Sequence, residues 1–182
     1  EAELAEVEAV YRSNKLSIRY YEPRVQRIPV SLEASGTYQV NLQNFYGSFV
    51  SLWVMLQYRN GVTADAISTL EELETLWITD ASNQTMFGGL IHSKDWLRYS
   101  ASRYYPSACL GNANIYAFNA SMHPAQDILT GSHGGSFALH AKGESLNFTT
   151  ASTMGSSDRQ VTIIGWHASC LRVQNGNIVA LR

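Results

Sequence analysis

The stretch that decides the fold of this chain runs from Ile115 to Phe137 and reads IYAFNASMHPAQDILTGSHGGSF. It opens with an apolar run typical of a buried strand, and Pro124 ends that run because proline has no N–H for a sheet ladder. A polar corner follows, and order returns after Thr130. We expect Pro124 and Gly131 to shape a turn between two strands, with no residue of the corner performing chemistry.

The composition indicates one globular domain with a full core. The chain has 182 residues, of which 45% are hydrophobic and 11% aromatic. Only 15% are charged, against about 25% in an average soluble domain. Either other subunits cover much of the surface, or Ser, Thr and Asn line the outer faces of a β-rich protein. The net charge of −2 argues against a nucleic-acid surface, which is normally basic.

Two cysteines, Cys109 and Cys170, are too few for a disulfide framework. We expect both thiols to be free and buried in a reducing compartment. The longest apolar run, 49–56, is much shorter than the roughly 18 residues of a membrane span. It is apolar on both faces, which predicts a strand that is covered on both sides.

Turn signals separate roughly eight strand-like segments along the chain. They are 16–32, 36–42, 48–59, 114–122, 134–141, 145–149, 160–173 and 177–181, with a further short strand at 77–79. Pro23 and Pro29 should interrupt the first of them and mark an edge, a bulge or a strand end, because proline lacks the donor for a sheet ladder. A short helix is expected over 94–104, before Pro106, and residues 69–72 have the composition of another helix start. The pattern predicts an all-β jelly-roll sandwich of two antiparallel four-stranded sheets, with one or two short helices in long loops.

Spacing within the opening stretch resembles that of the double jelly-roll major capsid proteins of large double-stranded DNA viruses and related phages. Tyr116, Pro124, Gly131 and Ser136 keep the family's intervals of eight, seven and five residues. Two further segments match in the family's order: 5–12, followed by the Tyr20-Tyr21-Glu22 cluster, and 161–176. The departures are Ala120, where the family has an aromatic residue, and Trp166-His167 and Ser169-Cys170 in the last hairpin. They indicate a distant lineage.

The resemblance implies that this chain is the second, C-terminal jelly roll of such a protein. Residues 1–15 would be the end of a preceding jelly roll or an inter-domain linker, and 16–182 a single jelly-roll domain. The resemblance further implies a structural protein of the virion, assembled in the host cell as a homotrimer of pseudo-hexagonal outline that tiles an icosahedral shell. Its partners would be neighbouring capsomers and minor capsid proteins, without direct contact with nucleic acid. An underlying membrane would leave no trace in this sequence.

Aromatic residues near arginines are the candidate subunit interface, because Tyr, Trp and Arg are enriched at interface hot spots. The candidates are Trp96, Arg98, Arg103, Tyr104, Tyr105, Tyr20 and Tyr21. Most lie in the excursion 62–113, which we expect to contact neighbours or decorate the outer surface. Burial of the tyrosines in the core remains the alternative.

No motif predicts catalysis, a cofactor or a metal. The five histidines lack metal-site spacing, and we expect them in loops or at strand edges. The run 131–135, GSHGG, does not have the spacing of a nucleophile elbow. Glu71, Glu72 and Glu74 resemble a solvated helix face. We therefore expect a protein that is not an enzyme.

Two other functions remain open from the sequence. The first is a carbohydrate-binding jelly roll, lectin-like or receptor-binding, with Trp96 and Tyr104 as aromatic platforms. The second is a metal-dependent enzyme on the same barrel, which the missing ligands disfavour.

Overall fold

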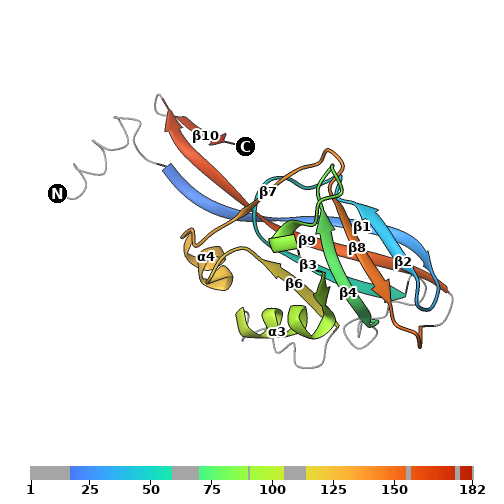
Figure 1. Ribbon diagram of the computed structural model, residues 1–182. Coiled ribbons are helices and arrows are strands. Elements are labelled where there is room, and N and C mark those ends of the chain that lie inside the picture. The colour runs from blue at the N-terminus through green and yellow to red at the C-terminus, as the bar shows by residue number, and fades with distance from the viewer. Residues whose placement is uncertain are drawn as a thin grey trace.

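Figure 1 shows the chain as a computed structural model, which describes residues 17–58, 70–89, 91–104, 114–154, 157–174 and 177–181. The strands are β1 (Ser17–Leu32), β2 (Thr37–Asn41), β3 (Tyr46–Tyr58), β4 (Leu73–Thr79), β5 (His92–Ser93), β6 (Ile115–Asn119), β7 (Phe137–His140), β8 (Ser145–Thr150), β9 (Ser157–Gln174) and β10 (Asn177–Leu181). The helices are α2 (Met86–Gly89), α3 (Lys94–Tyr104) and α4 (Pro124–Thr130). The segment 1–15, expected to be a linker or the end of another domain, lies outside the described residues.

The strands form two antiparallel sheets that pack face to face. The large sheet has the order β1-β9-β3-β6, with β10 paired to β9 and β7 paired to β3, and the small sheet has the order β2-β8-β4-β5. Strands that follow one another along the chain mostly alternate between the two sheets, so the chain crosses the sandwich repeatedly, as in a jelly roll. The predicted all-β jelly-roll class is confirmed. The prediction of four strands in each sheet is wrong for the large sheet, which has six because β7 and β10 extend it.

Strand β1 passes through both prolines without a break. Its register with β9 runs from Ser17 opposite Arg172 to Leu32 opposite Ser157, and it includes Pro23 and Pro29. The predicted interruption is therefore wrong, whereas the edge position that the prolines also indicated is confirmed. Because β1 is an edge strand of the large sheet, an imide nitrogen can face away from the ladder without removing a bond. Prolines on such an edge also hinder pairing with another chain.

The core lies between the sheets and is lined by alternate residues of each strand. Leu52, Val54 and Leu56 of β3 are almost fully buried and face the small sheet, where burial of each such side chain contributes about 1.5–3 kcal/mol. Trp53 and Met55, on the opposite face of β3, are half-buried. The prediction that this strand is covered on both faces is therefore met fully on the inner face and only partly on the outer one.

Residues 70–76 differ from the sequence expectation, whereas the short strand predicted at 77–79 is confirmed as the end of β4. The predicted helix start is wrong: β4 occupies Leu73–Thr79, and Leu76 and Ile78 are buried next to β8. The burial gained by these apolar side chains outweighs the local preference of the acidic residues for a helix N-terminus.

The corner after β6 holds a helix where a turn between strands was expected. The strand ends at Asn119 and α4 begins with Pro124, whose fixed φ and missing N–H suit the first helical turn. Gly131 ends the helix with φ 70° and donates its N–H to the carbonyl oxygen of Asp127 at 2.9 Å. Helix α3, in contrast, has the predicted bounds. No helix among the described residues has the length and apolarity that crossing a membrane requires.

Candidate subunit interface

Helix α3 presents an aromatic face away from the sheet. Its inner side packs along β6, with Leu97 and Ala101 buried and the Asn119 amide donating to Ser100 Oγ at 2.8 Å. On the outer side, Trp96 is 58% exposed and Tyr99 is 53% exposed. We call Trp96, Tyr99 and Arg103 the α3 face.

Members of the α3 face contact one another. The rings of Trp96 and Tyr99 lie with centroids 6.3 Å apart and planes 37° apart. One terminal nitrogen of Arg103 donates to the Tyr99 hydroxyl at 3.5 Å. Tyr99 was missed from the sequence, although its helical spacing from Trp96 and Arg103 would have placed it on their face. An exposed aromatic pair beside a guanidinium has the composition of an interface anchor.

The other predicted residues of this excursion have different surroundings. Arg98 is half-buried and lies near the buried Tyr116 hydroxyl, which accepts the Leu73 N–H at 2.8 Å. Burial raises the pKa of Tyr116 to about 12, and the charge of Arg98 opposes that rise. Tyr104 is the last residue of α3, but its side chain is outside the described set, as is the whole of Tyr105.

Tyr20 and Tyr21 lie far from the α3 face in the fold. Both are half-buried on β1, at one edge of the large sheet, whereas α3 packs on β6 at the opposite edge. The Tyr21 hydroxyl donates to the Ser132 carbonyl oxygen and so joins β1 to the corner after α4. The sequence-predicted residues therefore belong to two separate regions, and Tyr21 has a partner within its own chain.

The carboxylate of Asp127 holds the corner together. Asp127 is 3% exposed and accepts hydrogen bonds from Ser121 Oγ at 2.5 Å, Ser132 Oγ at 2.6 Å and the Gly134 N–H at 2.7 Å. Burial would raise the pKa of Asp127, but these three hydrogen bonds outweigh it and hold the pKa below its ordinary value. The intervals recognised in the sequence thus belong to a rigid structural corner.

A buried polar cluster on the inner face of the large sheet was missed from the sequence. His167 is 3% exposed, and its Nδ1 lies 2.9 Å from Ser169 Oγ, 3.3 Å from a terminal nitrogen of Arg24 and 3.3 Å from Glu22 Oε1. The Arg24 guanidinium stacks over the Tyr46 ring at 4.0 Å. The expectation that the histidines occupy loops or strand edges is wrong for His167, which lies between β1 and β3. The alternation of Glu22 and Arg24 on one face of β1 was the available signal.

The geometry of this cluster differs from that of a catalytic relay. In a Ser-His-acid triad the hydroxyl and the carboxylate take opposite nitrogens of the imidazole. Here Ser169, Glu22 and Arg24 all approach the same atom, Nδ1 of His167. The cluster therefore reads as a structural network.

The acidic residues near β4 are paired. The predicted helix is wrong because Glu74 lies on β4, although Glu72 and Glu74 remain solvated, with side chains 41% and 43% exposed. Glu71 binds the fully buried Arg159 through both carboxylate oxygens. Glu72 and Glu74 accept from Lys94 at 2.6 and 3.1 Å, which raises the pKa of Lys94 to about 12.

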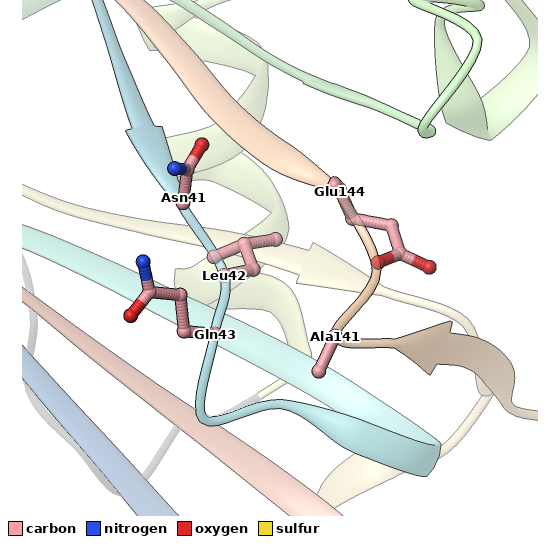
Figure 2. A pocket seen from close by; sticks show the side chains of 6 residues that line it. Asn41, Leu42, Gln43, Ala141 and Glu144 are labelled. Atoms are coloured by element: carbon pink, nitrogen blue, oxygen red, sulfur yellow. The ribbon is translucent and has the colours of Figure 1, made fainter.

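A hollow with a volume of about 330 Å³ lies between the end of β2 and the turn before β8 (Figure 2). It is lined by Asn41, Leu42, Gln43, Ala141, Gly143 and Glu144. Glu144 is 5% exposed and accepts the N–H groups of His140 at 2.8 Å and Lys142 at 2.9 Å. The Asn41 side chain accepts from Ser145 Oγ at 3.1 Å. Because these polar groups are engaged by the chain itself, the hollow is better explained as turn architecture than as a ligand site.

The described part of the chain contains no group of three or more His, Cys, Asp or Glu residues placed to hold a metal ion. Cys170 is free, but it is half-buried where full burial was expected. Cys109 lies outside the described residues.

The fold described above is the jelly roll found in viral major capsid proteins. The chain superposes on the Faustovirus major capsid protein with a TM-score of 0.61 and 14% identity, covering 93% of this chain and 36% of that one. The superposition on PBCV-1 VP54, fitted into a reconstruction of the virophage Sputnik, has a TM-score of 0.58 and 14% identity. It covers 96% of this chain and 54% of that one. The superposition on a chain of the quasi-atomic PBCV-1 capsid model has a TM-score of 0.55 and 13% identity, and it covers 92% of this chain and 52% of that one. The chain thus spans about half or less of each of these proteins.

The sequence itself matches no protein-family model and no curated protein. At 13–14% identity, the superpositions show a shared fold.

Proposed function

We propose that this chain is a structural capsid protein: one jelly roll of a trimeric, pseudo-hexagonal capsomer that tiles an icosahedral shell. The observation that carries the proposal is the superposition, which covers more than nine-tenths of this chain with jelly rolls of viral capsid proteins. Its location would be the virion, with assembly in the host cell. No step of this role requires a catalytic residue or a cofactor.

A companion jelly roll is the second part of the proposal. It is supported by the share of the capsid proteins that this chain covers, between 36% and 54%. It is also supported by the outer face of the large sheet, which is apolar yet incompletely covered. Trp53, Ile164 and Trp166 are half-buried there, and Val25 is 45% exposed. A companion domain on that face would remove these side chains from water.

The α3 face would supply contacts between subunits of the homotrimer, or between a capsomer and its neighbours and minor capsid proteins. Trp96 and Tyr99 offer large, already adjacent apolar surfaces, and Arg103 adds directional donors. Each contact is modest, but a closed symmetric assembly repeats it at every subunit.

Electron microscopy of the assembled protein tests the proposal directly. Full-length protein purified as particles should show capsomers of hexagonal outline that contain three copies, and light scattering of the dissociated capsomer should give a trimeric mass. A monomer that forms no capsomer under any assembly condition would refute it.

Carbohydrate binding is the second candidate, and the Trp96–Tyr99 pair is the specific observation that favours it. Two exposed rings whose planes lie 37° apart resemble the aromatic platforms on which sugar rings stack. Glycan-array binding by the isolated monomer, lost in Trp96→Ala, would favour this function over capsid assembly.

A further inference from the structure

A polar hollow lies on the outer face of the large sheet, where the corner after α4 meets β1. It has a volume of about 250 Å³. Its lining residues are Arg19, Ser48, His133, Ser136, Ala168, Ser169 and Cys170. They come from β1, β3, β9 and the segment between α4 and β7, so residues distant in the sequence meet here only through the fold. Figure 1 places α4 beside this end of the β1–β9 pair.

The junction that forms the hollow is held in place. Gly131 packs so closely on β1 that a Cβ there would lie 2.8 Å from the Arg19 carbonyl oxygen, and Gly131 has φ 70°. Tyr21 lies two residues after Arg19 on β1, and its hydroxyl donates to the Ser132 carbonyl oxygen. These contacts fix the backbone of Arg19 against the segment that carries His133. The two side chains that can carry positive charge are therefore presented by one rigid joint.

The chemistry of the lining is that of a donor site. Arg19 offers a guanidinium, His133 an imidazole, and Ser48 and Ser136 hydroxyl groups, while none of the lining residues is acidic. Among the described residues, Arg19 forms no salt bridge. Asp127 is the carboxylate near His133, and its oxygens are already occupied by the donors of Ser121, Ser132 and Gly134.

From this arrangement we propose that the hollow binds an oxyanion, either a phosphate or a carboxylate group. The Arg19 guanidinium makes the charge-assisted contact, and His133 and the hydroxyls of Ser48 and Ser136 complete the site. A guanidinium presents paired N–H groups that match two oxygens of either anion. The inference concerns a site of this chain alone and does not depend on the capsid role.

Titration of the 182-residue chain with inorganic phosphate tests the site. At constant ionic strength, amide resonances of Arg19, His133 and Ser136 should shift saturably in two-dimensional NMR spectra. A parallel titration with acetate distinguishes the two anions: saturation by either one supports the site, and the tighter one identifies its preferred chemistry. Matched additions of sodium chloride should produce no saturable shift.

Substitutions locate the binding. Arg19→Gln should weaken phosphate affinity about tenfold or more, as expected for loss of a charge-assisted contact. His133→Gln should weaken it less. Arg27→Gln is the matched control. Arg27 is exposed and lies on the same face of β1 as Arg19, but it does not line the hollow. The proposal is overturned if neither anion saturates, or if Arg27→Gln weakens binding as much as Arg19→Gln does.

Discussion

Arg159 on β9 and Glu71, which precedes β4, are joined by two hydrogen bonds between the guanidinium and both carboxylate oxygens. The Arg159 side chain is completely buried, and that of Glu71 is 15% exposed. The pair links the large sheet to the segment entering the small one. Loss of the carboxylate partner destabilises the fold far more when the guanidinium is buried than when it is exposed, because no water replaces the partner.

Glu71→Gln should therefore destabilise the fold by about 3 kcal/mol. Urea unfolding measures this change, with the midpoint falling and the slope unchanged. Glu72→Gln is the control, since Glu72 pairs with Lys94 near the surface and its loss should change stability little. Equal effects of the two substitutions would contradict the importance assigned to burial.

Asp127→Asn should loosen the corner more than it lowers global stability. The amide can no longer accept hydrogen bonds from Ser121, Ser132 and Gly134 together, and we expect a loss of about 1–3 kcal/mol. Hydrogen exchange should become faster in residues 120–136 and stay unchanged in β3. Asp158→Asn, whose carboxylate has an exposed bond to Ser31, is the control. Uniformly faster exchange across both sheets would show that the corner is not a separate unit.

The stability of the fold should decrease as the pH is lowered through the range in which His167 titrates. Burial lowers the pKa of His167, Arg24 lowers it further, and Glu22 opposes both. The unfolded chain thus binds this proton more readily than the folded chain does. The contribution to stability is complete above the ordinary pKa of 6.5 and is lost as pH falls from there through the lower folded value. Asp127 and Glu144 have lowered pKa values and act at more acidic pH, below their ordinary 3.8 and 4.5.

Unfolding free energies measured on either side of pH 6.5 check this. His167→Gln should reduce the slope and leave the part that comes from His92, whose pKa is also lowered by burial. His123→Gln, at an exposed position outside the cluster, should leave it unaltered. A slope that is undiminished in His167→Gln would assign the effect to another group.

Trp96→Ala should weaken assembly while leaving the fold intact. Trp96 is 58% exposed, so its removal leaves no cavity in the core. If it anchors an interface, truncation costs about 2 kcal/mol per contact, which is roughly thirtyfold in affinity. Light scattering over a dilution series measures the assembly, and thermal unfolding of the monomer measures the fold. Met122→Ala, 72% exposed but distant in sequence from the α3 face, should assemble normally.

Strand-like composition bounded by turn signals was sufficient to predict most strands of the sandwich. Segment 177–181 was predicted with the observed bounds of β10, and 145–149 differs by one residue from β8. Helix α3 was equally accessible, because Ser93, an acidic residue in the first turn and Pro106 mark it locally. These signals lie within a few residues of the element that they specify, so no tertiary knowledge is needed.

Local signals failed where long-range contacts decide. The acidic residues before β4 favour a helix by composition, yet burial of Leu76 and Ile78 against β8 makes that segment a strand. The prolines of β1 were compatible with an edge, a bulge or a strand end, and only the sheet order decides for the edge. The corner at Pro124 was recognised by its spacing, but its helix depends on hydrogen bonds to Asp127 from both flanking segments.

The sequence by itself determined the all-β class, the jelly-roll resemblance and the aromatic character of residues 94–104. Only the tertiary structure decided which of the candidate interface residues lie together, because Tyr20 and Tyr21 lie at the opposite sheet edge from Trp96. It alone brought His167 to Glu22 and Arg19 to His133. The physical reason is the same in each case. Alternation fixes which side of a strand a residue occupies, whereas strand order and register fix what it meets there.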